Sequence, residues 1–170
     1  TIDFKEKEIY SRIEVKEPFF VRLDGWKFHN LTSKLKKPFD KFFYESMAKT
    51  SELFFEIFNP SLAYVFSDEI NILFLKTTAF SRIEKINSVF AGLASSTLFS
   101  LIGKKYKVDR LSFDCRCIPI KKEEVVNYIL WRQSECFRNF NNAWCQYLLS
   151  KKGLTQKEVS KKLKDLKTKE

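Results

Sequence analysis

The sequence predicts an α+β fold of the ferredoxin-like kind, in which the element order is β-α-β-β-α-β and further helices are appended at the C-terminal end. Two segments with helical periodicity alternate with short runs rich in apolar, β-branched and aromatic residues. The second and third of these runs are close enough to form a tight hairpin. This topology gives an antiparallel sheet with two helices on one face, so the other face is available for a site.

The first strand and the first helix occupy the N-terminal third of the chain. Residues 18–24 (PFFVRLD) are the predicted strand, and Pro18 lies at its edge. A helix is predicted from the segment Lys37–Asp40 to about Phe58, because apolar residues recur there at helical spacing. Asn59-Pro60 ends that helix.

A hairpin and a second helix follow. Residues 61–67 and 70–76 are predicted strands around a tight turn at Asp68-Glu69. Ser81 and Glu84 have the spacing of a capping box, and Gly103 is a typical C-cap, so a helix is predicted between them.

The C-terminal part is predicted to contain a fourth strand, 111–118, and two helices. The first helix runs from about Lys122 to Ser150 and is closed by Gly153. Thr155 and Glu158 predict a capping box for a last, lysine-rich helix. An apolar stripe on the long helix is expected to pack on the body of the protein; it comprises Val126, Ile129, Leu130, Phe137, Phe140, Trp144 and Leu148.

Composition restricts the classes of partner. The chain has 31 Lys and Arg against 21 acidic residues, a net charge of +10, which favours nucleic acid over a membrane as the anionic partner. No apolar run reaches the length that spans a bilayer and no signal peptide opens the sequence, so a cytoplasmic protein is expected. The four cysteines form no Cys-x-x-Cys pair and His29 is the single histidine, which favours reduced thiols over a zinc site.

Acidic residues interrupt two segments that otherwise resemble buried strands. Arg22 and Asp24 share one face of the first strand, and the topology places this strand beside the hairpin, so that Asp24 approaches Asp68. Two carboxylates about 4 Å apart repel by roughly 4 kcal/mol at an effective dielectric of about 20. A divalent cation between them, Mg²⁺ when phosphates complete its shell, removes this cost. Singly, each motif also suits an ordinary Asp-Gly turn or a surface hairpin.

The residues after Asp24 suit phosphate binding. Gly25 lets a triphosphate or a metal approach the bare backbone closely. The loop Gly25–His29 is then expected to surround phosphate oxygens with main-chain N–H groups.

The long helix has an unusual polar face. It carries three asparagines, Asn139, Asn141 and Asn142, although asparagine is a poor residue for a helix interior. Together with Arg132 and Arg138, these amides suit contacts with phosphate, sugar or base. The alternative is a solvated helix face, which more often uses Lys and Glu.

Six motifs together resemble the tRNA-histidine guanylyltransferases and their archaeal and bacterial relatives, the 3′-to-5′ polymerases. The resemblance extends from about Phe19 to Leu163. The motifs are VRLDGWKFH (21–29), KPFD (37–40), SDE (67–69), FDCR (113–116), WRQ (131–133) and GLTQKEVSKKL (153–163).

The resemblance implies a polymerase-like palm that holds two Mg²⁺ ions and a nucleoside triphosphate, GTP, ATP or another. The metal ligands implied are Asp24, the carbonyl of Gly25, and Asp68. Glu69 matches an acidic neighbour and joins Asp24 and Asp68 as a predicted catalytic residue. The nucleotide-binding residues implied are Asp24, Gly25, Trp26, Lys27, Phe28, His29, Ser67 and Asp68.

The reaction implied is addition of a nucleotide to the 5′ end of tRNA. Arg22, Lys37, Arg132 and Arg138 are predicted to neutralise phosphates, and Asn139 to position the RNA end. Lys37 and Asp40 match the Lys-Pro-x-Asp element of the family and are assigned to 5′-end or phosphate handling. The family tends to form dimers of dimers, so a homo-oligomer is expected.

Two departures from the family pattern qualify this prediction. Phe137-Arg138-Asn139-Phe140 replaces the His-Ile-Asn-Asn motif of the eukaryotic enzymes, which favours the archaeal branch and template-dependent 5′-end repair over non-templated guanylate addition to histidine tRNA. Relatives also continue beyond the last helix. We therefore predict a palm-like catalytic domain with its long helix at 1–150, and a basic helix that begins an incomplete C-terminal region at 151–170.

Two other functions would account for some of these sequence features. A nucleotidyl cyclase on the same palm would need the carboxylates but no RNA. An inactive RNA-binding module would need the positive charge, including the eight lysines of residues 151–170, but not Asp24, Gly25 and Asp68 together.

Overall fold

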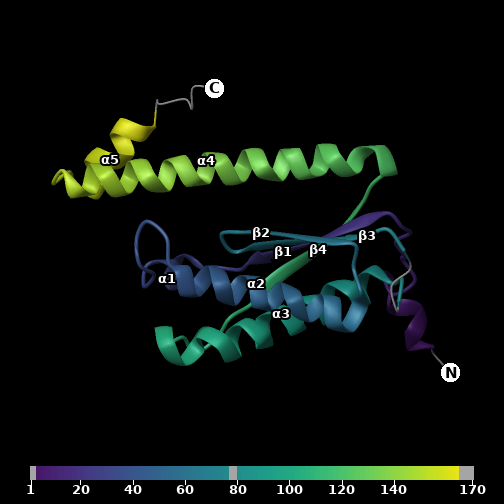
Figure 1. Ribbon diagram of the computed structural model, residues 1–170. Helices are drawn as coiled ribbons and strands as arrows, with labels where there is room; N and C mark the ends of the chain where they lie inside the picture. Colours follow the sequence, from purple (N-terminus) through teal and green to yellow (C-terminus); the bar gives the residue numbers. More distant parts are fainter. Residues whose placement is uncertain (1–2, 77–79, 165–170) are drawn as a thin grey trace.

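A four-stranded antiparallel sheet lies at the centre of the protein (Figure 1). The computed structural model describes residues 3–76 and 80–164. The strands are β1 (Phe19–Gly25), β2 (Leu62–Phe66), β3 (Glu69–Phe74) and β4 (Phe113–Pro119). Their order is β2-β3-β1-β4, which is the order of the ferredoxin-like fold and confirms the predicted fold class.

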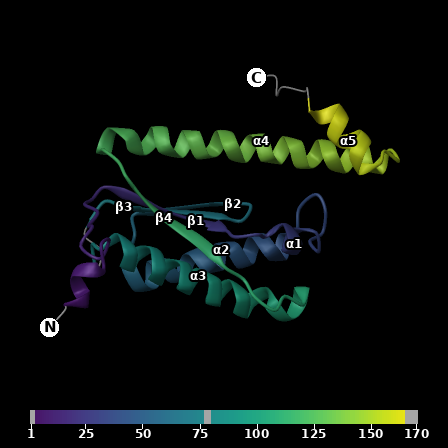
Figure 2. The ribbon, with the colours of Figure 1, turned by 180° about the vertical axis from the view of Figure 1, so that it is seen from behind.

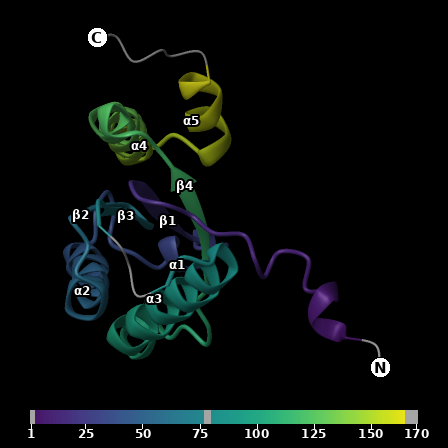
Figure 3. The ribbon, with the colours of Figure 1, turned by 90° about the vertical axis from the view of Figure 1, so that its right-hand side faces the viewer.

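Helices cover both faces of this sheet. Figures 1 and 2, which view the molecule from opposite sides, place α2 and α3 below the sheet and α4 above it, and Figure 3 shows the same layers from the end. The long helices are α2 (Lys41–Phe58), α3 (Ile83–Tyr106) and α4 (Val125–Lys151). The short ones are α1 (His29–Thr32), α5 (Gln156–Leu163) and the 3-10 helices η1 (Phe4–Lys7) and η2 (Lys122–Glu124).

The alternation of side chains along β1 separates the core from the site. Phe19, Val21 and Leu23 belong to the main core, which α2 and α3 complete. The alternate residues of β1 face α4 instead: Phe20 packs there with Tyr128 in a smaller apolar cluster, and Arg22 and Asp24 follow it along the same face. The space between the sheet and α4 thus holds polar side chains next to a small apolar cluster.

Helix α3 supplies much of the core. Five of its residues are fully buried at helical spacing: Ile86, Phe90, Ala94, Leu98 and Ile102. By length and composition alone α3 is apolar enough to cross a membrane, which differs from the expectation that no segment reaches this level. The core helix of a globular domain meets the same criterion.

Several predicted boundaries move by one or more residues. The hairpin turn is Ser67-Asp68 rather than Asp68-Glu69, so Glu69 is the first residue of β3. The predicted Ser81–Glu84 capping box is wrong, because α3 begins after Arg82, which has extended backbone. Gly103 is not the C-cap either: α3 continues to Tyr106, and Lys107 takes the left-handed conformation (φ 50°).

The C-terminal caps were predicted correctly. Gly153 follows α4 with φ +85°, a conformation that favours glycine. Thr155 and Glu158 form both hydrogen bonds of a capping box at the start of α5. Residues 165–170 of the predicted basic region lie outside the described residues.

The predicted packing of the apolar stripe of α4 is wrong for most of its residues. The buried residues of α4 are Tyr128 and Arg132, whereas Val126, Leu130, Phe137 and Leu148 are each more than half exposed. The reason is that α4 lies over the polar layer of the sheet and turns its polar residues inward. Of the stripe, Ile129 packs against the cluster of Phe20 and Tyr128, and Phe140 and Trp144 contact Phe39, which precedes α2.

Candidate active site

An acidic edge forms where β1 ends, the β2–β3 hairpin turns and β4 begins. The main-chain N–H of Gly25 donates to the carbonyl of Asp68 at 3.0 Å, which holds the hairpin tip beside the end of β1. Asp24 lies opposite Glu69 on β3 and opposite Asp114 on β4. The topology therefore brings Asp24 and Asp68 together as expected, and adds two carboxylates to the same edge.

This convergence of carboxylates is electrostatically unfavourable. Partial burial raises the pKa of Asp24, and the charges of Asp68, Glu69 and Asp114 raise it further, while Arg22 lowers it. A cation at this edge would offset the repulsion.

The donor set fits a magnesium ion that takes part of its shell from phosphate. No three His, Cys, Asp or Glu side chains within residues 3–76 and 80–164 form a ready-made metal cage. Mg²⁺ usually binds one or two carboxylates and completes its shell with water and substrate phosphates, a role that Asp24, Asp68 and the Gly25 carbonyl can share. The Ser67 hydroxyl donates to Asp68 Oδ1 at 3.0 Å and orients that carboxylate.

Asp114 was missed as a site residue. Its Oδ2 accepts from Arg116 at 2.8 Å, and its Oδ1 is buried with no hydrogen-bond partner among the described residues. The available signal was the FDCR motif itself: pairing of β4 with β1 places its aspartate opposite Asp24. The register of β4 on β1 decides this neighbour, and the two strands are too far apart in the sequence for a turn to indicate that register.

Glu69 has a partner other than a metal. It is 6% exposed and forms a two-pronged ion pair with Arg132, in which Nε and Nη2 each donate to one carboxylate oxygen at 2.8 Å. The guanidinium also lies 4.3 Å from the centroid of the Trp131 ring. The catalytic role of Glu69 and the phosphate-binding role of Arg132 stay predictions, because the two charges are paired with each other in the structure.

This ion pair belongs to a chain of hydrogen bonds between β3 and α4. Asn71 Nδ2 donates to Glu69 at 2.7 Å, and the hydroxyl of Tyr128 donates to Asn71 Oδ1 at 2.7 Å. Tyr128 and Arg132 lie one turn apart on α4, and the Tyr128 ring stacks on Phe20 with centroids 3.9 Å apart. These contacts hold α4 over the acidic edge.

The loop after Asp24 is shaped by its aromatic residues. Phe28 is buried against Gly25, where an added Cβ would lie 2.5 Å from the ring. Trp26 and Lys27 are exposed, and His29 is exposed at the start of α1. Gly25 is therefore required for close packing against Phe28, in addition to any approach of a phosphate or metal.

Gly25→Ala is expected to lower the free energy of unfolding by about 1–3 kcal/mol, because Phe28 must move to admit the methyl group. Gly92→Ala is the matched control: nothing lies within 4 Å of its added Cβ, and alanine is favoured in a helix by about 1 kcal/mol. Denaturant unfolding of both variants measures the difference. Equal stability of the two variants would contradict the packing argument.

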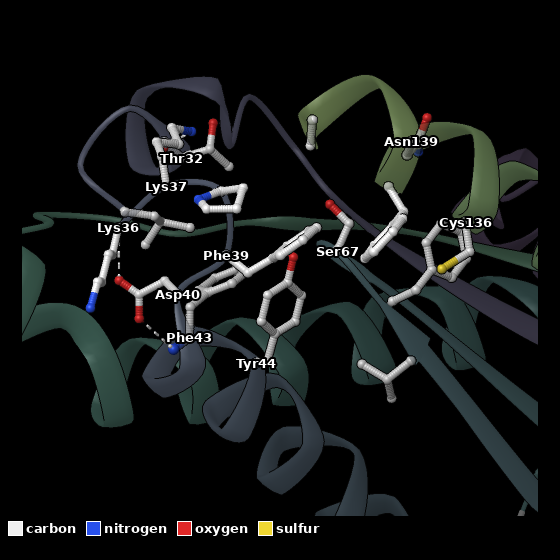
Figure 4. Close-up of a pocket in the computed structure, with 16 residues that line it drawn as sticks. Thr32, Lys36, Lys37, Phe39, Asp40, Phe43, Tyr44, Ser67, Cys136 and Asn139 are labelled. Carbon is white, nitrogen blue, oxygen red and sulfur yellow. Dashed lines mark hydrogen bonds between the residues drawn. The ribbon is translucent and has the colours of Figure 1, made fainter. Parts of the chain in front are cut away.

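A cavity of about 430 Å³ lies beside the acidic edge, between the loop before α2, the end of β2 and α4 (Figure 4). Its polar lining includes Lys37, Asp40, Tyr44, Ser67 and Asn139, and Figure 4 shows these side chains around one space. The stacked pair Phe39–Phe140 (centroids 5.1 Å apart) forms an aromatic wall. The cavity thus joins Ser67, next to Asp68, with three residues predicted to bind RNA or phosphate.

Two of the predicted phosphate ligands already have local partners. Lys37 Nζ donates to the Thr32 carbonyl at 2.8 Å. Burial alone would raise the pKa of Asp40, but hydrogen bonds from Lys36 N–H, the Tyr106 hydroxyl and Phe43 N–H outweigh it and lower the pKa. Asp40 therefore caps α2 and ties it to α3.

The other two arginines predicted to bind phosphate, Arg22 and Arg138, lie in different environments. Arg138 pairs with Glu135 on the surface of α4. Arg22 lies on the face of β1 covered by α4, 5.9 Å from the Trp131 ring centroid, and its Nε has no hydrogen-bond partner in the described part of the chain. Arg22 is thus the better placed of the two to meet a phosphate at the acidic edge.

Comparison with known proteins agrees with this architecture. A family model described as Thg1, tRNAHis guanylyltransferase, matches residues 2–121. Among curated proteins, uncharacterized protein R259 of Acanthamoeba polyphaga mimivirus is 28% identical over 81% of this chain and 58% of its own length. tRNA(His) guanylyltransferase 1 of Arabidopsis thaliana is 28% identical over 95% of this chain and 30% of its own length. The chain thus spans less than two thirds of the length of each of these two relatives.

Solved structures give the same result. A bacterial tRNA(His) guanylyltransferase (Thg1)-like protein in complex with GTP is 32% identical, with a TM-score of 0.74 over 80% of this chain and 71% of that one. A bacterial Thg1-like protein in complex with ATP is 28% identical, with a TM-score of 0.77 over 95% and 76%. The Saccharomyces cerevisiae tRNA(His) guanylyltransferase (TM-score 0.80 over 99% and 80%, 22% identity) supports the fold. The chain belongs to the Thg1 family of tRNAHis guanylyltransferases.

Proposed function

We propose that this protein is a nucleotidyltransferase that adds nucleotides to the 5′ end of tRNA in the 3′-to-5′ direction, with Mg²⁺-bound nucleoside triphosphates as substrates. The observation that carries the proposal is the acidic edge at Asp24 and Asp68 opening, through Ser67, into a cavity of about 430 Å³. A cavity of this volume suits a small ligand such as a nucleoside. The GTP and ATP complexes of the bacterial relatives support a triphosphate as that ligand.

The reaction starts from an activated tRNA 5′ end, and the steps below are those for a 5′ end that already bears a triphosphate. On a 5′ monophosphate, transfer of AMP from ATP would come first and release pyrophosphate, and AMP would then replace pyrophosphate as the leaving group. The 3′-hydroxyl oxygen of the incoming nucleotide attacks the α-phosphorus at that 5′ end and forms the new phosphodiester. The bond to the β-phosphate breaks, and pyrophosphate leaves while the hydroxyl proton is lost to solvent. The incoming nucleotide keeps its own triphosphate, which becomes the new 5′ end.

The residues of this chain have distinct roles in that scheme. Asp24, Asp68 and the Gly25 carbonyl would hold Mg²⁺, which when bound lowers the pKa of the attacking hydroxyl and stabilises charge on the phosphates. Main-chain N–H groups of the loop Gly25–His29 would bind the triphosphate, and Arg22 would neutralise phosphate charge. Ser67 orients Asp68, and the cavity walls hold the base and sugar.

Template dependence is part of the proposal. The FRNF sequence at 137–140, in place of the eukaryotic His-Ile-Asn-Asn, supports selection of the incoming nucleotide by pairing with the opposite strand. Non-templated guanylate addition to histidine tRNA is the alternative. A homo-oligomer and a cytoplasmic location also stay predictions.

The test uses a tRNA that lacks its first 5′ nucleotide and carries a 5′ triphosphate, incubated with Mg²⁺ and each nucleoside triphosphate in turn. Extension by the complementary nucleotide alone is the expected result. Guanylate addition regardless of the opposing base would contradict template dependence and support the non-templated alternative. Pyrophosphate release without RNA would instead indicate a cyclase.

A further inference from the structure

A second cavity, of about 440 Å³, lies between the loop that follows β1 and the segment that leads into β4. Its lining includes Trp26, Lys27, Asn30, Arg110 and Ser112 over an apolar floor that contains Phe28. Among the described residues it shares no lining residue with the cavity beside Ser67. Trp26, Lys27 and Phe28 of the loop Gly25–His29 thus line this second cavity, and no residue of that loop lines the first.

The charge of this cavity is positive. Lys27 and Arg110 line it, and none of the lining residues that the structure describes is acidic. Asp109 is exposed next to Arg110 in the chain. Lys34 donates to the carbonyls of Tyr106 and Lys107 at the end of α3, so that the helix terminus nearby is capped by a further cation. An anionic ligand suits this environment.

The aromatic wall of the cavity is held in place but open to a ligand. Trp26 is 56% exposed, and its main-chain N–H donates to the Ser112 carbonyl at 2.8 Å, which joins the two walls. Lys27 Nζ lies 4.6 Å from the Trp26 ring centroid. Lys27 also has φ 55°, a left-handed conformation that costs a non-glycine residue energy and is common at binding sites.

An exposed aromatic ring beside cations is the arrangement with which proteins bind unpaired nucleotides. We propose that this cavity binds one unpaired nucleotide of the RNA substrate, with its base stacked on Trp26 and its phosphate between Lys27 and Arg110. The proposal rests on the proposed function and adds a second nucleotide site to it.

A nucleotide within RNA fits better than a free triphosphate. A nucleoside triphosphate brings about four negative charges and a bound Mg²⁺, which needs oxygen ligands from carboxylates. The lining that the structure describes offers two cations and no carboxylate, which suits the single phosphate of a nucleotide in a chain. The acidic edge that suits the metal faces α4 and the first cavity instead.

The test measures binding of a fluorescein-labelled single-stranded RNA tetranucleotide to the full chain by fluorescence anisotropy. Trp26→Ala is expected to weaken binding about 10-fold, since base stacking on an aromatic residue contributes about 1–3 kcal/mol. Trp26→Phe should restore most of the affinity.

Arg110→Ala should weaken binding and reduce the slope of log K against log salt by about 0.7, the value for one phosphate contact on a single strand. Phe4→Ala and Arg12→Ala, which remove an exposed aromatic ring and an exposed arginine far from the cavity along the chain, are the controls.

A fluorescent GTP analogue with Mg²⁺ separates this proposal from the proposed function. Arg110→Ala is expected to leave GTP affinity within about twofold while RNA affinity falls. Equal losses of GTP and RNA affinity would show one shared site and overturn the proposal, as would unchanged RNA affinity in both Trp26→Ala and Arg110→Ala. If these two variants bind RNA normally while the unmodified protein extends tRNA, the second site is refuted and the proposed function stands.

Discussion

Replacing Arg132 by methionine is expected to lower the free energy of unfolding by about 3–5 kcal/mol, because it leaves the buried carboxylate of Glu69 without its partner. The two side chains are 9% and 8% exposed, so water does not replace the lost hydrogen bonds. Arg138→Met is the matched control, since its ion pair with Glu135 is on the surface and contributes little. Chemical denaturation measures both variants.

The double variant Glu69→Met/Arg132→Met tests what the pair does. Apolar residues of similar volume often replace a buried ion pair at no net cost, so most of the lost stability should return. If the pair serves to hold α4 over the acidic edge, nucleotide addition should return with it. Full stability without any addition would contradict this positioning role and support direct catalysis by Glu69.

Asp24→Asn is expected to reduce nucleotide addition on the order of 10³-fold, because it removes an anionic metal ligand whose interaction with the ion is worth several kcal/mol. The folded protein should remain intact. Burial and the neighbouring carboxylates raise the pKa of Asp24, so the ionised carboxylate is less favourable in the folded state than in the unfolded one. A neutral amide removes this cost at pH 7. Single-turnover addition and thermal unfolding measure the two effects separately.

The metal site can also be tested through the effect of Mg²⁺ on thermal stability. Mg²⁺ with GTP should raise the unfolding temperature of the unmodified protein by mass action, and should not do so for Asp24→Asn. Asp109→Asn, which removes an exposed carboxylate near the second cavity, should retain both the addition and the Mg²⁺ effect. Undiminished addition by Asp24→Asn would contradict the assignment of the metal site.

The same carboxylate gives the direction of a pH effect. Because the folded-state pKa of Asp24 is raised, the folded protein binds this proton more tightly than the unfolded chain does. The ionised Asp24 carboxylate therefore destabilises the fold at pH values above the raised pKa. This destabilisation is relieved as the pH falls through that pKa and the carboxylate takes up its proton. Asp24→Asn abolishes this contribution, which explains why loss of activity and retention of stability are expected together.

The order of the elements, the ferredoxin-like sheet and the approach of Asp24 to Asp68 were predictable from the amino-acid sequence, because they follow from local periodicity and topology. The caps at Gly153, Thr155 and Glu158 were also predictable, since they depend on residues close in sequence. Family motifs added the expected ligands of the metal and the nucleotide.

Which charged side chains are paired, and with which partners, depends on contacts that form only in the folded protein. Asp114 joins the acidic edge through the register of β4 on β1, and Glu69 is paired to Arg132 across 63 positions of sequence. The apolar pattern of α4 predicted the wrong buried face, since amphipathicity specifies a stripe but not the surface that it meets. Register and helix orientation depend on contacts between distant segments, and a linear pattern does not contain them.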